Sequence, residues 1–199
     1  MYERLHLEDE DEFFRVSTGS LPDLEVVREV MTEAYARFAD ENSGKAADYI
    51  PALARVSPDL FGVSMVGVGG ADIGMGDCDH LFSIQSISKP FVFALVCQAL
   101  GAEGARARVG VNATGLPFNS VMAVELNADR TMNPMVNAGA IATTSCVPGA
   151  NAEEKFRFIQ DGLSRFAGRR LEVDEEVYTS EAETNLRNRG IAKLLEGYD

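Results

Sequence analysis

The sequence predicts a mixed α/β chain of the α+β type, in which an antiparallel sheet accompanies a cluster of helices. Residues 61–68 alternate like a strand, Gly69-Gly70 is a tight-turn signal, and residues 71–76 form a second short run, so we expect an antiparallel hairpin. Apolar residues recur at helical spacing over 23–40 and again over 156–166, which predicts two amphipathic helices. A continuous apolar run over 91–97 predicts a third, buried helix.

The first half of the chain contains a surface helix, a loop and the hairpin. Ser20 and Pro22 are start signals for the helix over 23–40. Its expected apolar face consists of Leu24, Val27, Met31, Ala34, Tyr35 and Phe38. The sequence then predicts a loop over residues 44–51 and a short element that begins at Ile50 and ends near Pro58.

The second half is expected to be helical apart from its loops. Residues 112–121 form a loop rich in Gly, Pro and Asn, and a further loop from residue 132 enters a helix of small residues that reaches 142. Asn151 with Glu154 predicts a capped helix start, and Gly168 predicts the end of that helix. A single last helix over 177–195 would place Glu181 and Asn188, seven residues apart, on one face.

Composition restricts the classes of function. The chain has 199 residues and a formal net charge of -13, which disfavours nucleic acid and anionic membranes as partners. No stretch has transmembrane length and the N-terminus lacks a secretory signal, so we expect a cytoplasmic protein with no membrane association. We expect one domain over residues 1–199, in which residues 1–20, with the acidic run 8–12, form a mobile arm.

Cysteine and histidine are too scarce to indicate a disulfide framework or a metal site. Cys78, Cys97 and Cys146 are an odd number without paired spacing. His6 and His80 are the only histidines, which argues against a multi-histidine metal site and against a Ser-His-Asp triad. We therefore expect no metal, and any serine nucleophile needs another base.

Ser86 and Lys89 supply that combination. The i,i+3 spacing puts the hydroxyl and the amine on one face if a helix begins near Ser86, where backbone N–H groups can also hold an oxyanion. Ser-x-x-Lys is the acyl-transfer signature of the penicillin-recognising fold, and desolvation of Lys89 would favour its free-base form. The spacing also fits an ordinary helix start with a serine cap and a snorkelling lysine.

Five segments together resemble the serine-dependent glutaminases, which hydrolyse L-glutamine to L-glutamate and ammonia on a β-lactamase-like fold. They occur in the order that the family has: Ala47-Asp48-Tyr49-Ile50-Pro51, Leu60-Phe61-Gly62-Val63, Gln85-Ser86-Ile87-Ser88-Lys89-Pro90, residues 133–141, and Ser180-Glu181 followed by Arg187-Asn188-Arg189. The resemblance extends from about the first helix to the last residue.

The resemblance implies roles for six residues. Ser86 becomes the nucleophile and Lys89 its base, with an acyl-enzyme intermediate and no cofactor. Tyr49, Asn137, Glu181 and Asn188, together with Ser86, line the glutamine pocket that the family has. Glu181 can accept from the substrate ammonium, and the two amides can donate and accept hydrogen bonds. Each of these four also has a structural interpretation: Asn137 as a helix cap, Asn188 as an exposed amide, Glu181 on a solvated face and Tyr49 in packing.

The chain departs from the family pattern in two places. It ends where roughly the last third of a family member would begin, so a β-lactamase-like or transpeptidase-like fold would be incomplete in these residues. Asn185-Leu186 stands where the family has a glycine and a polar residue, which affects the turn before Asn188. Two alternatives follow: a catalytically incompetent remnant that binds glutamine or a partner chain, and a penicillin-recognising hydrolase, which would share Ser86 and Lys89 but not residues 133–141. The resemblance also implies a homodimer or homotetramer.

Overall fold

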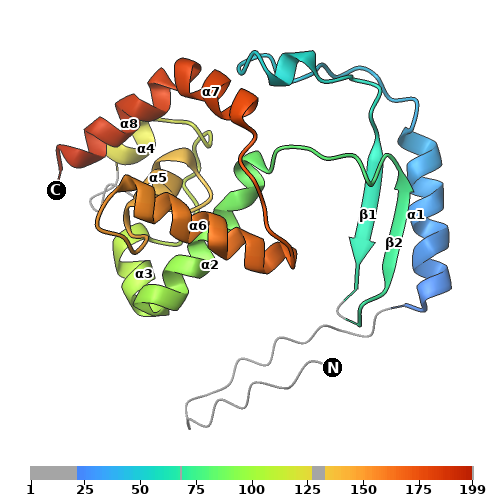
Figure 1. The fold of residues 1–199 in the computed structure, drawn as a ribbon, viewed down its shortest axis with the longest axis horizontal. Coiled ribbons are helices and arrows are strands. Elements are labelled where there is room, and N and C mark those ends of the chain that lie inside the picture. Colours follow the sequence, from blue (N-terminus) through green and yellow to red (C-terminus); the bar gives the residue numbers. More distant parts are fainter. Residues whose placement is uncertain (1–21, 68, 127–132, 199) are drawn as a thin grey trace, which may run out of the picture. The chain divides into compact units, whose positions relative to one another are not determined.

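A computed structural model describes residues 22–67, 69–126 and 133–198, and the expected N-terminal arm lies outside these residues. The described chain forms two compact units (Figure 1). The first unit includes residues 22–43 and 59–80, and the second includes residues 44–58 and 81–198. No helix within the described residues is long and apolar enough to cross a lipid bilayer.

The first unit confirms the predicted hairpin and its neighbouring helix. Strands β1 (Gly62–Val66) and β2 (Asp72–Gly76) pair antiparallel, with Gly62 opposite Gly76 and Val66 opposite Asp72. Helix α1 (Leu24–Phe38) contacts β2 and buries Met31. The α1 side chain Tyr35 stacks on Phe61, with ring centroids 5.1 Å apart. Other members of the predicted apolar face, such as Leu24 and Phe38, are exposed within the unit.

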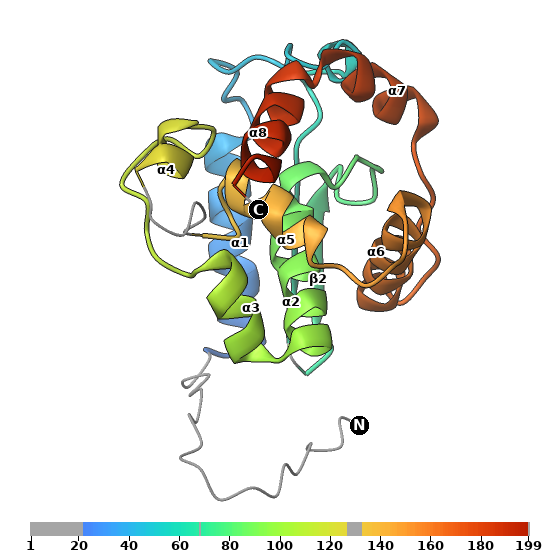
Figure 2. The same cartoon turned by 90° about the vertical axis from the view of Figure 1, so that its left-hand side faces the viewer.

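The second unit is helical and contains two apolar clusters. Its elements are η1 (Leu53–Arg55), η2 (Gln85–Ile87), α2 (Ser88–Leu100), α3 (Ala102–Val109), α4 (Met122–Glu125), α5 (Asn137–Ser145), α6 (Ala152–Ala167), α7 (Glu175–Thr184) and α8 (Leu186–Glu196). The first cluster centres on Val92 and Val96 of α2, with Ala105 and Val147. The second joins Val124, Ala138 and Ile191, from α4, α5 and α8. Helix α5 lies between α2 and α8 in Figure 2, and it contacts both.

Local sequence signals set the ends of α6 as predicted. The Asn151 side chain accepts from the Glu154 N–H at 3.0 Å, and the Glu154 carboxylate accepts from the Ala150 N–H at 2.8 Å. Gly168 ends the helix in the left-handed region at φ 65°. The middle of α6 packs closely on α2, because a Cβ on Gly162 would lie 2.3 Å from a methyl carbon of Leu95.

The predicted single helix over 177–195 is wrong. The structure has two helices, α7 and α8, which are separated at Asn185 (φ -86°, ψ 25°). Glu181 and Asn188 therefore lie on different helices, and the argument that a continuous helix puts them on one face does not hold. The helices α3 and α4 were not predicted from the sequence; α3 lies between Gly101 and Gly110 and contains Gly104, a residue type that disfavours helix interiors.

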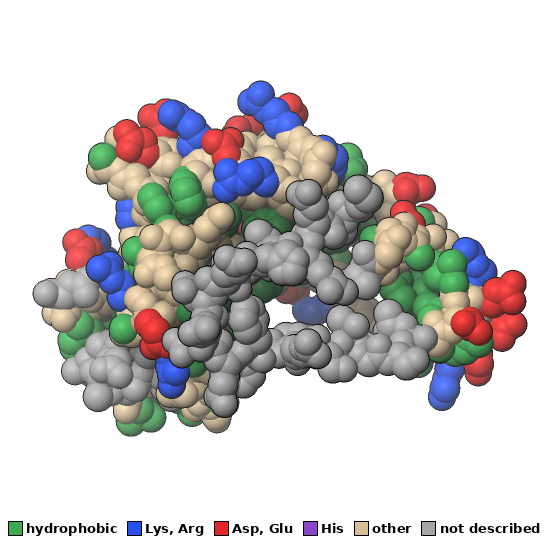
Figure 3. Space-filling view, turned by 90° about the horizontal axis from the view of Figure 1, so that it is seen from below, with side chains coloured by type: hydrophobic (Ala, Val, Ile, Leu, Met, Phe, Trp, Pro, Cys, Tyr) green, Lys and Arg blue, Asp and Glu red, His purple; other side chains and the backbone are tan. Residues whose placement is uncertain are grey.

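Charged side chains of both signs lie on the described surface. On the face shown in Figure 3, basic and acidic side chains lie interspersed among uncharged ones. Three of the ion pairs between exposed side chains in the described residues are local, such as Lys45 with Asp48 and Arg157 with Glu153 at 2.7 Å, and the fourth joins Arg55 to Glu176. Exposed pairs of this kind contribute little to stability.

Candidate active site

Ser86 lies at the centre of the short turn that leads into the buried helix α2. The turn η2 covers Gln85–Ile87 and α2 begins directly afterwards at Ser88, so Ser86 and Lys89 are one helical turn apart. The expected helix start near Ser86 is therefore confirmed to within two residues. The Ser86 residue is exposed, and within the described part of the chain no hydrogen bond engages its hydroxyl.

Backbone strain is located immediately before Ser86. Gln85 has φ 44°, a left-handed value that side chains other than glycine rarely adopt. Two hydrogen bonds hold this conformation. The Ser88 hydroxyl donates to the backbone carbonyl of Gln85 at 2.7 Å, and the side-chain amide of Gln85 donates to the Ser83 hydroxyl at 3.3 Å. Strained backbone is often found where a structure presents a reactive group.

Lys89 is held by two acceptors from the loop and helix that follow residue 132. Its Nζ donates to Asn137 Oδ1 at 2.8 Å and to the Met135 carbonyl at 3.1 Å. Partial burial lowers the pKa of Lys89, because desolvation disfavours the charged amine. A neutral amine has two N–H donors and one lone pair. Two acceptors therefore satisfy both donors of the neutral form and leave its lone pair free to accept a proton.

Asn137 connects this lysine to the last helix. It is the first residue of α5, its N–H donates to the Phe118 carbonyl at 2.8 Å, and its Nδ2 donates to Asn188 Oδ1 at 3.4 Å. Val136, not Asn137, occupies the capping position, and Val136 makes no side-chain cap bond. The interpretation of Asn137 as a helix cap is therefore wrong in this structure.

The approach of the 133–136 loop to α5 requires a glycine. A Cβ on Gly139 would lie 1.8 Å from the Asn133 carbonyl oxygen, which is backbone and cannot rotate away. The loop itself is shaped by Asn133, whose Oδ1 accepts from the Met135 N–H at 2.8 Å. This close packing fixes the Met135 carbonyl and Asn137 relative to each other, and both contact Lys89.

Asn188 enters the site from α8 and is half-buried, so the interpretation as an exposed amide is also wrong. The helix that carries it is tied to α7 by Arg189, which donates to the Ala182 carbonyl at 3.0 Å. At the break between the two helices, the Asn185 side-chain oxygen is buried and, within the described residues, has no hydrogen-bond partner.

Tyr49 and Glu181 are not part of this network. Tyr49 is 68% exposed, and Glu181 is half-buried on α7. In the described part of the chain, no hydrogen bond joins either side chain to Lys89, Asn137 or Asn188. Their segments do contact each other, because the Ala52 N–H donates to the Ser180 hydroxyl at 3.1 Å. Arg55 and Glu176 form an ion pair between the same two segments.

Sequence reasoning missed two neighbours of Lys89. The Met135 carbonyl is a backbone group, so residue type carries no signal for it. The Phe118 ring has its centroid 5.8 Å from Lys89 Nζ, and an apolar neighbour of this kind reduces hydration of the amine. Phe118 lies in the expected loop over 112–121, where nothing in the local pattern indicates contact with a helix start.

The arrangement fits nucleophilic attack by a hydroxyl. A serine on a strained turn lies one helical turn from an amine of lowered pKa, and an amide pair fixes that amine.

Comparison with known proteins places this chain in a family. The sequence model of the family described as glutaminase matches residues 44–199. The chain is 57% identical over 183 residues to Glutaminase 2 of Yersinia pestis, covering 92% of this chain and 54% of that protein. It is 48% identical over 178 residues to a glutaminase of Colwellia psychrerythraea, covering 89% of this chain and 57% of that protein.

Solved structures of glutaminases are also similar to this chain. The probable glutaminase YbaS superposes with a TM-score of 0.84 at 39% identity, covering 88% of this chain and 57% of that chain. A probable glutaminase from Bacillus subtilis complexed with 6-diazo-5-oxo-L-norleucine has a TM-score of 0.70 at 32% identity, covering 96% of this chain and 55% of that chain. The predicted β-lactamase-like fold class is confirmed by this likeness. The chain spans about half the length of the curated relatives it matches. Because the family model matches more than half of the chain, the chain belongs to the glutaminase family.

Proposed function

We propose that this chain carries the nucleophile and base of an L-glutamine amidohydrolase, with Ser86 as the nucleophile and Lys89 as the base that activates it. The observation that carries the proposal is the environment of Lys89. Its amine is partly desolvated, its pKa is lowered, and Asn137 and Met135 accept its two hydrogen bonds. An ordinary snorkelling lysine would keep its amine in water and its pKa at the usual value.

The reaction proceeds through an acyl-enzyme. Ser86 Oγ attacks the γ-carboxamide carbon while its proton passes to Lys89 Nζ, and the C–O bond forms as the carbonyl becomes an oxyanion. Backbone N–H groups, including that of Ser86, stabilise the oxyanion. Collapse breaks the C–N bond, and the departing nitrogen takes the proton from Lys89 and leaves as ammonia. Water, deprotonated by the same amine, then releases L-glutamate and restores the Ser86 hydroxyl. These steps use no metal or organic cofactor.

Four side chains are proposed to recognise the substrate. Glutamine carries an α-carboxylate and an α-ammonium, so a selective pocket needs donors for the first and an anionic acceptor for the second. Asn137 and Asn188 can supply amide donors, and Glu181 the acceptor. Tyr49 is proposed to contact the substrate because its segment is attached to α7, the helix of Glu181.

The remaining predictions concern the whole protein. We propose that residues 1–199 belong to one glutaminase domain, and that residues 1–20 are an acidic arm. Assembly as a homodimer or homotetramer, a cytoplasmic location, and the absence of nucleic-acid or membrane partners stay predictions. Gel filtration with light scattering would test the first of these.

The test measures ammonia release from L-glutamine by the purified chain, with Ser86→Ala as the matched control. We expect turnover that the variant abolishes, while the thermal unfolding midpoint changes little, because Ser86 is exposed and makes no hydrogen bond within the described residues. The second measurement uses 6-diazo-5-oxo-L-norleucine, the compound in the Bacillus subtilis complex. Mass spectrometry should find an adduct on Ser86 that carries the analogue without its dinitrogen.

The outcomes separate the alternatives. An adduct on Ser86 without turnover supports the proposed nucleophile and shows that hydrolysis of glutamine needs groups beyond this chain. Glutamine binding by calorimetry with neither adduct nor turnover favours the binding remnant. Acylation of Ser86 by a β-lactam, but not by the glutamine analogue, favours the penicillin-recognising hydrolase. Equal turnover by the wild type and by Ser86→Ala removes Ser86 from the mechanism.

A further inference from the structure

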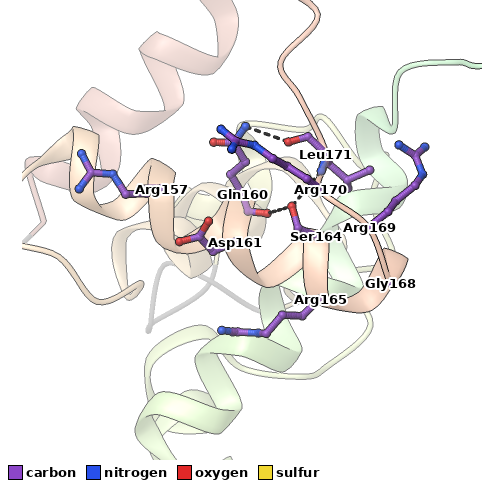
Figure 4. A pocket seen from close by; sticks show the side chains of 9 residues that line it. All are labelled: Arg157, Gln160, Asp161, Ser164, Arg165, Gly168, Arg169, Arg170 and Leu171. Atoms are coloured by element: carbon purple, nitrogen blue, oxygen red, sulfur yellow. Dashed lines mark hydrogen bonds between the residues drawn. The ribbon is translucent and has the colours of Figure 1, made fainter.

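A hollow of about 740 Å³ lies beside the C-terminal half of α6 and the loop that follows it (Figure 4). All of its lining residues come from one segment, and none of them contributes to the Lys89 network. The lining residues are Arg157, Gln160, Asp161, Ser164, Arg165, Gly168, Arg169, Arg170 and Leu171.

Local hydrogen bonds build this surface by folding the chain back along the helix. Gly168 turns the backbone at φ 65°, which residues other than glycine rarely adopt. The segment that follows is attached to α6 twice: Gln160 Nε2 donates to the Leu171 carbonyl at 3.1 Å, and the Leu171 N–H donates to the Ser164 hydroxyl at 3.0 Å. The backbone of Arg169 and Arg170 is therefore held between the end of α6 and these two bonds.

The charge of the hollow contrasts with that of the chain. Four arginines and one aspartate line it, in a chain of net charge -13. Arg157 pairs with Glu153 at 2.7 Å. Within the residues that the structure describes, the other three, Arg165, Arg169 and Arg170, make no ion pair. We call these three residues with Arg157 the arginine surface.

We propose that the arginine surface binds an acidic peptide segment of a partner protein. The guanidinium groups do not converge on one point, because in Figure 4 Arg157, Arg165 and Arg169 extend in different directions from the hollow. A single small anion could contact only one or two of them, whereas a chain with several carboxylates can pair with each in turn.

Spacing supports an extended acidic segment. Arg157 and Arg165 are eight residues apart in α6, which corresponds to about 12 Å along the helix axis and about 80° around it. Alternate side chains of a five-residue extended segment point the same way and span about 13 Å. The overall net charge works against a long polyanion such as nucleic acid, but it acts weakly on a short segment, because salt screens charges beyond about 8 Å.

The experiment titrates the full chain with a fluorescent peptide that contains Glu-Asp-Glu-Asp-Glu between Gly-Ser flanks, and follows anisotropy at physiological salt. Each exposed arginine replaced by glutamine should weaken binding by about twofold to fivefold, so the triple variant Arg165→Gln, Arg169→Gln, Arg170→Gln should weaken it by about tenfold or more. The matched control removes the same charge elsewhere, at the exposed Arg28, Arg37 and Arg106.

We expect saturable binding that the triple variant loses and the control variant keeps. A neutral control peptide, with Gln-Asn-Gln-Asn-Gln in place of the acidic residues, should not bind. Equal weakening in both variants would overturn the proposal, because it would show attraction to general positive charge. Displacement by inorganic phosphate at the same concentration as the acidic peptide would also overturn it, in favour of a small-anion site.

A single Arg169→Gln variant, altered only in an exposed loop residue, keeps the test valid if the triple variant unfolds. Ser86→Ala should leave the binding unchanged, since the proposal does not rest on the proposed function.

Discussion

Replacing Asn137 by Asp places a carboxylate where an amide oxygen now accepts from Lys89. The two side chains have the same shape, so we expect the contact of 2.8 Å between Lys89 Nζ and the side-chain oxygen to persist. Even with the dielectric constant of bulk water, two unit charges at that separation attract by about 1.5 kcal/mol. That energy is about a tenfold change in an equilibrium. The substitution should therefore raise the pKa of Lys89 and reduce its free-base fraction by at least about tenfold wherever the wild-type amine is largely neutral.

Carbon-13 NMR of the lysine Cε atoms measures this directly. The chain has only four lysines, and the Lys89→Met variant identifies the resonance in question. In the wild type, Lys89 should titrate at lower pH than Lys45, because burial lowers the pKa of Lys89 whereas the hydrogen bond and charge of Asp48 raise the pKa of Lys45. In Asn137→Asp, the Lys89 titration should move to higher pH.

The control is Asn151→Asp, which adds the same charge at the cap of α6, where aspartate caps as well as asparagine. It should leave the titration of Lys89 unchanged. The reasoning is refuted if the wild-type Lys89 titrates at the same pH as Lys45 or above it, or if Asn137→Asp moves the Lys89 titration to lower pH. If the chain turns over glutamine, the rise of activity with pH should move upward in the same variant.

Two further substitutions test the backbone around the site. Because Gln85 has φ 44°, the Gln85→Gly variant should be more stable than Gln85→Ala by about 1 kcal/mol in the free energy of unfolding, and it should unfold at a higher temperature. The opposite order would show that the turn is not strained. Gly139→Ala should cost about 3 kcal/mol in the free energy of unfolding, because the new Cβ would meet the Asn133 carbonyl oxygen at 1.8 Å. Gly190→Ala in α8, where nothing lies within 4 Å of the added carbon, should instead stabilise the folded chain by about 0.5–1 kcal/mol. Equal changes in the free energy of unfolding for the two alanine variants, measured with denaturant, would contradict close packing at Gly139.

The features that sequence predicted correctly are those that local chemistry determines. The hairpin follows from alternation and a glycine turn, the start of α6 from the Asn151–Glu154 pair, and its end from Gly168. The relation of Ser86 to Lys89 depends only on helical spacing. Each of these requires no contact between distant parts of the chain, so the residues concerned carry enough information.

The features that sequence missed depend on tertiary contacts. Asn185 is not a strong helix breaker, yet the helix is interrupted there. The Arg189 side chain of α8 then bonds to a carbonyl group of α7. The second acceptor of Lys89 is a backbone carbonyl 46 residues away in sequence, which no pattern of residue types can indicate. Family resemblance suggested Asn137 and Asn188 for the substrate pocket, but only the structure shows that they bond each other and that one of them holds the lysine.

Helix α5 is the element that makes these contacts possible. It carries Asn137 at its first residue and contacts α2, which carries Lys89, as well as α3 and α8. Ala138 belongs to the apolar cluster with Ile191, so burial of that cluster sets the distance between Asn137 and Asn188. The two acceptors of Lys89 are therefore positioned by packing within the second unit. For that reason, the titration of Lys89 in this chain tests the site even if turnover requires further residues.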